Sequence, residues 1–260
     1  MEQSLIEIIG GILTITYLRY LIIAGIFFLI FYVLFKKKWQ SKKIQNRFPK
    51  NKDYNREIGY SILSLFIFML VGLVAHKSPI AQWSLRYDSI AEYGTAYWFL
   101  SVILMIFLHD TYFYWTHRAM HHPKIYRSFH KVHHQSTNPS PWAAFAFHPL
   151  EGVVEAGIIF PIIFFIPHHF SAVFAFLIFM TVYNVYGHLG YEIFPKGFNK
   201  NRIGKWLNTS VSHNAHHAQF NGNFGLYFLF WDRCMGTLRT DYDSGFKEVD
   251  QLRTSSKAIQ

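Results

Sequence analysis

The sequence of 260 residues predicts an all-α integral membrane protein, with about four or five membrane helices and a helical cap that holds most of the histidines. Composition is the first reason, because 51% of the residues are hydrophobic and 19% are aromatic, which is more apolar than an ordinary soluble domain. The second reason is that the apolar residues gather in runs of helical length. We expect one domain over 1–260, with membrane helices and a basic loop in 1–104, a histidine-rich region in 105–240 and a polar tail in 241–260.

Five apolar runs are the candidate membrane helices, at 12–35, 58–74, 95–107, 153–166 and 170–186. The first contains Arg19 as its only charge and exceeds the roughly 20 residues that a spanning helix needs. The third reaches that length only if it continues through the polar residues of 109–115. The fourth is short, so a bent hairpin or half-buried helices are alternatives for that part of the chain.

The net charge of +10 is concentrated directly after the first run. The basic residues there are Lys36, Lys37, Lys38, Lys42, Lys43, Arg47, Lys50 and Lys52. The positive-inside bias places this loop in the cytoplasm, and following the runs from there brings all the closely spaced histidines to the same side. His76, His168 and His169 then lie at the opposite membrane edge. A basic block can also bind nucleic acid, but its position between two spans favours anionic lipid headgroups, and we expect no nucleic-acid partner.

Eight histidines form three boxes whose spacings of three and four residues direct imidazoles along one face of a helix. The boxes are His117-Arg-Ala-Met-His121, His130-Lys-Val-His133-His134 and His213-Asn-Ala-His216-His217. Eight imidazoles are more than one tetrahedral ion can use, so their number favours two transition-metal ions. Cys234 is the only cysteine, which excludes an internal disulfide and a cysteine-ligated zinc site.

The composition and position of the boxes distinguish three kinds of function: hydrolysis, metal transport or storage, and oxidation. They lack the glutamate of the His-Glu-x-x-His pattern of zinc proteases, which disfavours hydrolysis. A metal transporter or metal store is the non-enzymatic alternative, but transport predicts ligands inside the spans, whereas these boxes flank them. Imidazole ligands beside an apolar approach favour the activation of dioxygen against a C–H bond of a lipid.

Four further histidines have separate expectations. His188, at the end of the fifth run, is expected to be a ninth ligand. His109 either ligates metal or, with Asp110, holds a ligand imidazole by a hydrogen bond. His148 is expected to support a ligand or to gate the entry of the substrate. His122 is turned away from the first box and is expected at the surface.

The stretch from Asp110 to Pro123 and the stretch Phe129-His-Lys-Val-His-His134 resemble the fatty acid hydroxylase and sterol desaturase superfamily. The resemblance continues through Asn184-Val-Tyr-Gly-His188, the third box and Trp231-Asp-Arg233, covers about half of the chain, and is strongest to the C-5 sterol desaturases. It implies a membrane-embedded di-iron oxygenase with a cytosolic catalytic cap. The ligands that it implies are His117, His121, His130, His133, His134, His188, His213, His216 and His217, and the supporting residues are Asp110, Arg118, Asp232 and Arg233.

The resemblance also implies a reaction and its partners. The reaction is an O2-dependent hydroxylation or desaturation of a membrane lipid, and the alternative is oxidative cleavage of a long-chain ether lipid or aldehyde. Two iron ions and O2 would be needed, with electrons from a separate cytochrome b5-like or ferredoxin-like protein and its reductase. The bacterial inner membrane and the endoplasmic reticulum both fit.

Two details of the site stay open at the sequence level. Hydroxylases of this superfamily can contain a further His-x-x-x-His, but here His188 is followed at that spacing by Glu192, so a tenth histidine is missing and ligation by Glu192 is open. The aromatic residues that are candidates to line a lipid channel, or else to pack and face lipid, are Trp142, Phe145, Phe147, Phe160, Phe164, Phe165 and Phe179.

Overall fold

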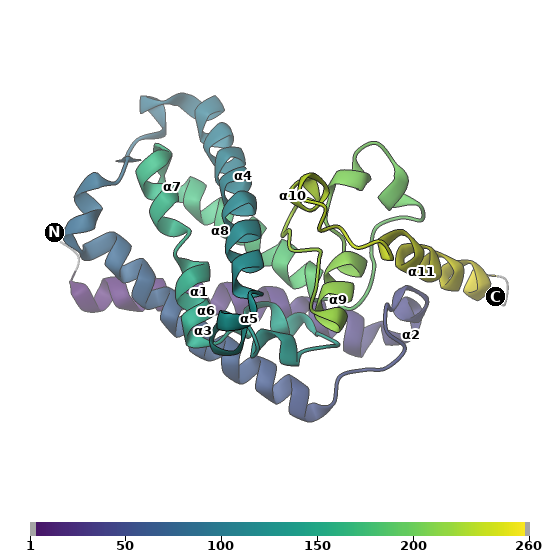
Figure 1. Cartoon of the computed structure of the whole chain (residues 1–260). Helices are drawn as coiled ribbons and strands as arrows, with labels where there is room; N and C mark the ends of the chain where they lie inside the picture. Colours follow the sequence, from purple (N-terminus) through teal and green to yellow (C-terminus); the bar gives the residue numbers. More distant parts are fainter. Residues whose placement is uncertain (1–3, 258–260) are drawn as a thin grey trace.

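The computed structural model describes residues 4–257 and is all-α, as the sequence predicts (Figure 1). Four helical segments are long and apolar enough to cross a membrane. They are α1 (Leu5–Phe28) with its π-helical extension Leu29–Leu34, α3 (Asn51–Lys77), α4 (Gly94–Met120) and α8 (Phe170–Gly187). The shorter α-helices are α2 (Lys36–Trp39), α5 (Pro123–Phe129), α6 (Pro149–Ala156), α7 (Ile159–Phe165), α9 (Ser210–Gln219), α10 (Phe230–Cys234) and α11 (Tyr242–Lys257). The protein is therefore a multi-pass membrane protein.

The fourth apolar run is not among the four helical segments that are long and apolar enough to cross a membrane. It is broken into α6 and α7, which are 8 and 7 residues long and meet at Gly157 and Ile158. Pro161 in α7 has no backbone N–H to donate to the carbonyl of Gly157, so a continuous helix would lack that hydrogen bond. Residues 153–166 therefore form two short helices with a bend between them, as the expected alternatives of a bent hairpin or half-buried helices allow.

The third run does continue past its apolar part. Helix α4 extends through 109–115 to Met120 and ends at the first histidine box. The polar residues in this stretch can be accommodated because His109, Asp110 and His117 are each at most 3% exposed and so face the protein interior. This continuation delivers the first box from a membrane helix.

A segment without α-helix, 136–147, which contains one short 3-10 helix at Pro141–Phe145, lies among the long helices and is held by their side chains. Tyr20 of α1 and Ser61 of α3 both donate to the carbonyl of Trp142, at 3.0 and 2.9 Å. Asn184 of α8 donates to the carbonyl of Ala144 at 2.7 Å. Irregular backbone is tolerated deep in a membrane protein only where such partners satisfy its polar groups. The segment thereby connects the second box to α6.

The two ends of α4 separate the histidine boxes from His168 and His169. Before α4, the strand β1 (Arg86–Tyr87) pairs in parallel with β2 (His168–His169). The boxes follow the other end of α4, which is 27 residues and therefore about 40 Å long. His168 and His169 thus lie at the opposite end from the boxes, as expected.

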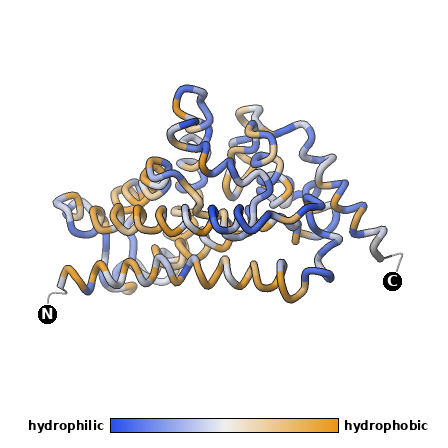
Figure 2. The backbone as a smooth tube through the Cα atoms, turned by 90° about the horizontal axis from the view of Figure 1, so that it is seen from below, coloured by the Kyte–Doolittle hydropathy of each residue, from blue (hydrophilic) through white to orange (hydrophobic). Residues whose placement is uncertain are grey.

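The polar tail covers the cap. Tyr242, Phe246 and Val249 of α11 are buried in one cluster with Val211 of α9 and Leu229. In Figure 2 apolar residues follow the long helices from the N-terminus, and hydrophilic residues are frequent towards the C-terminus.

Candidate metal centre

Four parts of the chain bring their histidines to one place. The end of α4 supplies the first box, the turns after α5 supply the second, the end of α8 supplies His188 and α9 supplies the third. Within each of two groups the ligand nitrogens all lie within 4.8 Å of one another. The first group is His117, His121, His130, His134 and His216, and the second is His133, His188, His213 and His217. All nine histidines singled out from the sequence are in these groups.

The boxes are not the units of the two groups. Both histidines of the first box are in the first group. In the second box, His134 is in the first group and His133 in the second. In the third box, His216 is in the first group, and His213 and His217 are in the second. Adjacent residues on a helix point about 100° apart, so neighbouring histidines face different centres. The expectation that each box lies along one face therefore holds for the first box only.

The imidazole nitrogens have the spacing of ligands around an ion. In the first group the Nε2 atoms of His117 and His130 are 2.9 Å apart, and in the second group the Nε2 atoms of His188 and His213 are 3.1 Å apart. Metal–nitrogen bonds of about 2.0–2.1 Å, at ligand angles between about 90° and 109°, put neighbouring ligand nitrogens about 2.8–3.4 Å apart. Converging lone pairs at this distance repel unless a cation or proton lies between them, so the donor set fits bound metal.

Hydrogen bonds at the outer nitrogens orient several rings. In each, Nδ1–H donates to a backbone carbonyl, which leaves the Nε2 lone pair directed to the centre. These bonds join His117 to Phe224 at 2.9 Å, His188 to Asn184 at 2.8 Å and His216 to Gly222 at 2.7 Å.

The rings are buried and neutral. Burial lowers the pKa of His188 to about 4 and holds the pKa values of His213 and His216 well below the usual value for histidine. At neutral pH these imidazoles are therefore unprotonated and free to ligate. The two groups adjoin, because the rings of His134 and His217 have centroids 4.9 Å apart.

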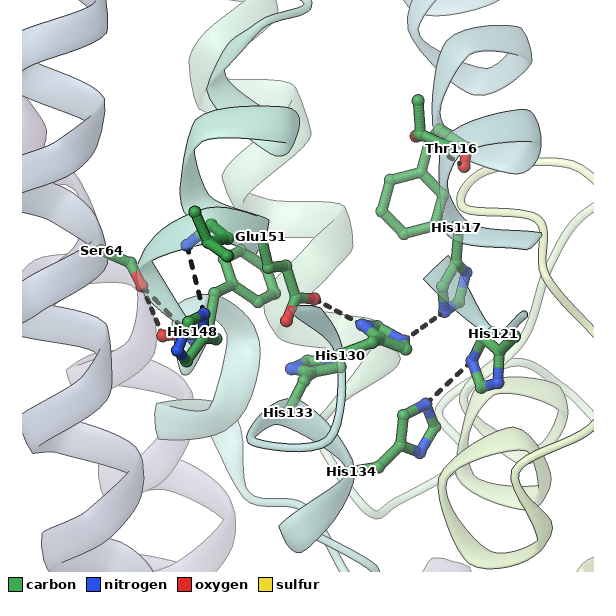
Figure 3. A network of polar contacts seen from close by, with 12 residues as sticks. Ser64, Thr116, His117, His121, His130, His133, His134, His148 and Glu151 are labelled. Atoms are coloured by element: carbon green, nitrogen blue, oxygen red, sulfur yellow. Dashed lines mark hydrogen bonds and ion pairs between the residues drawn. The ribbon is translucent and has the colours of Figure 1, made fainter. Parts of the chain in front are cut away.

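Glu151 is a functional candidate that the sequence reasoning missed. Its Oε1 lies 2.6 Å from Nδ1 of His130, and both side chains are at most 2% exposed (Figure 3). Burial raises the pKa of the Glu151 carboxyl and lowers that of His130. A weak signal was present, since Pro149 at the first position of a helix puts Glu151 in its first turn.

His148, expected to support a ligand or to gate the entry of the substrate, lies at the start of α6. It is half-buried and caps α6, where its Nδ1 accepts a hydrogen bond of 3.3 Å from the backbone of Leu150. Among the described residues it contacts no imidazole of the two groups. Its effect on them is indirect, through the start of the helix that holds Glu151.

Two predicted supporting residues, Asp110 and Asp232, act through backbone. Asp110 accepts hydrogen bonds from the amides of Tyr227 and Phe228 at 2.8 and 3.1 Å. Asp232 accepts from the amides of Phe224 and Gly225 at 2.9 and 2.8 Å. The carbonyl of Phe224 in turn accepts a hydrogen bond from His117. Asp232 therefore helps to hold a ring of the first group in place through the backbone of Phe224.

The two predicted supporting arginines lie apart from the imidazoles. Arg118 donates to the hydroxyl of Tyr114 at 3.2 Å, and Arg233 donates to the carbonyl of Lys205 at 3.0 Å. In the described part of the chain neither contacts a ring of the two groups, and Arg233 forms no ion pair with Asp232. Arg118 instead interacts electrostatically with Asp232.

The two open ligands fall outside both groups. His109 pairs through Nδ1 with the hydroxyl of Tyr227 at 2.8 Å. Glu192 accepts from the hydroxyl of Tyr186 at 2.8 Å and from the amide of Val211 at 3.2 Å, which supports the first turn of α9. His122 is exposed, as expected, and caps α5.

A cavity of about 150 Å³ lies near the two histidine groups and is separated from them by Phe113 and Phe147. Its walls come from α1, α3, α4, α6, α7, α8 and the segment 136–147, and most of its lining is apolar. Phe147 of the lining has its ring centroid 5.0 Å from that of His133, and Phe113 lies 4.9 Å from His117. Of the seven aromatic residues expected to line a channel, Phe145 and Phe147 do so.

Comparison with known proteins gives a consistent result. A model of the family described as fatty acid hydroxylase matches residues 102–237, which is 136 of 260 residues and so just over half of the chain. The chain is 31% identical over 218 residues to a Delta(7)-sterol 5(6)-desaturase of Gibberella zeae, covering 82% of this chain and 63% of that protein. It is 30% identical over 197 residues to lathosterol oxidase of Homo sapiens, covering 74% and 63% respectively.

A third relative is a Delta(7)-sterol 5(6)-desaturase of Leptosphaeria maculans, 31% identical over 191 residues, with 70% of this chain and 51% of that protein covered. The chain therefore spans between one half and two thirds of the length of these relatives. No solved structure matches it.

Proposed function

This chain belongs to the fatty acid hydroxylase family, and on that premise we propose that it is a di-iron, O2-dependent oxidoreductase that hydroxylates or desaturates a membrane lipid. One observation carries the proposal. Nine imidazoles from distant parts of the chain converge in two adjoining groups, and an apolar cavity lies next to them, behind Phe113 and Phe147, whose rings contact His117 and His133.

The ligand assignment follows the two groups. His117, His121, His130, His134 and His216 would hold one iron, and His133, His188, His213 and His217 would hold the other. Glu151 would accept the outer N–H of His130 and so orient that ring and increase its basicity. Ligation by nitrogen suits iron, among other transition metals.

Bound iron would supply the reductive activation of O2 and the removal of hydrogen from an unactivated C–H bond. Hydroxylation and desaturation both consume one O2, two electrons and two protons, and both begin with the same hydrogen removal. The electrons would come from a separate cytochrome b5-like or ferredoxin-like donor with its reductase. The protein's own part is to hold the lipid: apolar walls exclude water, and Phe113 and Phe147 border the histidines.

The catalytic side is proposed to be cytoplasmic, in a bacterial inner membrane or the endoplasmic reticulum. The basic segment 36–52 is the strongest topological signal, and it lies on the side of the histidines. Gln45 in this segment donates to Asn214 of the third box at 2.9 Å. The packing of α11 on α9 supports the proposal that the C-terminal part described by the structure belongs to the same domain as the histidine region.

Purification of the protein without oxygen, followed by metal analysis, tests the centre. We expect two iron ions per chain and new oxidised lipids in extracts of cells that express the protein. Mass spectrometry of those lipids separates an alcohol or alkene from the aldehyde of an ether cleavage. A protein free of iron, or metal flux in proteoliposomes without oxygen consumption, would reject the proposal and favour transport.

A further inference from the structure

The cavity near the histidines is lined by a cation that has no hydrogen-bond or ion-pair partner among the described residues, although Tyr227 lies close enough to interact with it electrostatically. Arg19 of α1 lines it and is 7% exposed. Its guanidinium makes no hydrogen bond or ion pair within the described part of the chain, and its Nε is fully enclosed. A buried charge without a partner is strongly unfavourable. Arg19 therefore lowers the stability of the ligand-free protein, and a counter-charge on a bound ligand would remove this penalty.

The other polar residues around the cavity do not supply that counter-charge. His109 is hydrogen-bonded to Tyr227, and Asn184 donates to the carbonyl of Ala144. Glu155 is the only acidic residue in the lining, and it forms no ion pair with Arg19. Burial raises the pKa of Glu155 to about 8, so at neutral pH it is mainly an uncharged acid.

We propose that Arg19 binds the carboxylate of a lipid substrate, so that the cavity selects a long-chain free acid. A guanidinium presents two parallel N–H donors that match the two oxygens of a carboxylate. Arg19 is the only lysine or arginine in the lining, which fits a single negative charge. This inference rests on the proposed lipid oxidation and adds the substrate class to it.

The size of the cavity and its surroundings agree with an end-group site. A volume of about 150 Å³ holds one end of a lipid, comparable to a cavity that binds benzene. The remaining lining is mainly Ile, Phe, Leu and Met, suited to methylene groups. Since the histidine side of the cavity is bordered by Phe113 and Phe147, the carbon that is oxidised would be set by its distance from the carboxylate.

Binding of palmitate, hexadecanol and methyl palmitate to the iron-loaded protein in nanodiscs without oxygen tests this inference. The readout is the ligand-induced rise in unfolding temperature, which follows affinity and needs no turnover. We expect palmitate to bind about tenfold or more tightly than the alcohol and the ester, because a charged hydrogen bond to an otherwise unpaired cation is lost with either. Equal affinities for the three ligands would overturn the proposal.

The variant Arg19→Met separates recognition from a structural role. We expect it to lose the preference for palmitate and, without ligand, to unfold at a higher temperature than the wild type, because an unpaired buried charge is removed. Arg19→Lys should keep part of the preference. Arg86→Met, which changes an exposed arginine paired with Asp88 at the other end of α4, is the matched control. Retained preference in Arg19→Met, or a lower unfolding temperature, would show that Arg19 serves the fold.

The two proposals fail in different ways. His133→Ala should lose lipid oxidation yet retain the preference for palmitate, because it changes the centre and leaves Arg19 in place. If the wild type binds the acid selectively but contains no iron, the oxygenase proposal is wrong and the carboxylate site stands. If the wild type oxidises lipids but does not bind the acid selectively, the carboxylate site is wrong and the oxygenase proposal stands.

Discussion

Glu151 lies 2.6 Å from His130 through Oε1 and Nδ1, and this is the one carboxylate hydrogen-bonded to a ring of the two histidine groups within the described residues. The ring therefore has a carboxyl partner on one side and the centre on the other. Since no other ring of either group has such a partner, His130 is distinguished from the remaining eight histidines. A ligand oriented in this way binds metal more tightly than an isolated imidazole.

Replacement of this carboxylate should weaken the first metal site. We expect Glu151→Ala to lower iron affinity about 10- to 100-fold, as is typical for loss of a hydrogen-bonded partner of a ligand. Glu151→Gln should lose less, because its amide oxygen still accepts from Nδ1. Metal competition with a chelator measures both. Identical iron affinity in wild type and Glu151→Ala would contradict the proposed role.

Removal of a ligand from the second group should act differently from loss of an orienting partner. We expect His133→Ala to abolish lipid oxidation and to reduce bound iron towards one ion per chain. The reason is that the second group would keep only three of its four ligands, whereas the first group would be unchanged. Iron content and product formation are measured on the same preparation. His76→Ala, an exposed histidine at the far end of α3, is the control and should match the wild type. Full activity in His133→Ala would refute the assignment of His133 as a ligand.

The nine histidines could be singled out from the sequence because their signal is local. Each box has helical spacing, and His188 ends an apolar run. Which histidines share a centre could not be predicted, since His216 joins rings from α4 whereas its neighbour His217 joins the ring of His188. That division depends on the packing of α9 against two other helices.

Glu151 illustrates the same limit. It is 21 residues from His130 in the chain, and its contact exists only because α6 folds back beside the second box. Likewise the break at Gly157 and Ile158 lies inside an apolar run whose length alone allowed a bent or a continuous helix. Composition predicts that such residues are buried, but not which partner they meet.

Filling the cavity should reduce turnover without removing the metal. Ala156 lines the cavity from α6, so Ala156→Trp places a large ring where the lipid would lie. We expect lipid oxidation to fall about tenfold or more, because a substrate displaced by about an ångström reacts poorly, while iron content stays unchanged. Val153→Trp, on the exposed face of the same helix at 49% exposure, is the matched control. Equal loss in both variants would indicate a general effect on α6 instead of an occupied cavity.

The buried carboxyl of Glu155 should make stability depend on pH. Burial raises its pKa from 4.5 to about 8 in the folded protein, so between these values the folded state binds more protons than the unfolded state, and stability falls as pH rises. Glu155→Gln removes this penalty. Its stabilising effect should therefore grow from pH 6 to pH 8, by about 2 kcal/mol given 1.36 kcal/mol for each pKa unit. Chemical unfolding of the wild type and the variant in detergent, without lipid ligand, measures the difference at each pH. A difference that does not change between the two pH values would show that Glu155 is ionised in the folded protein.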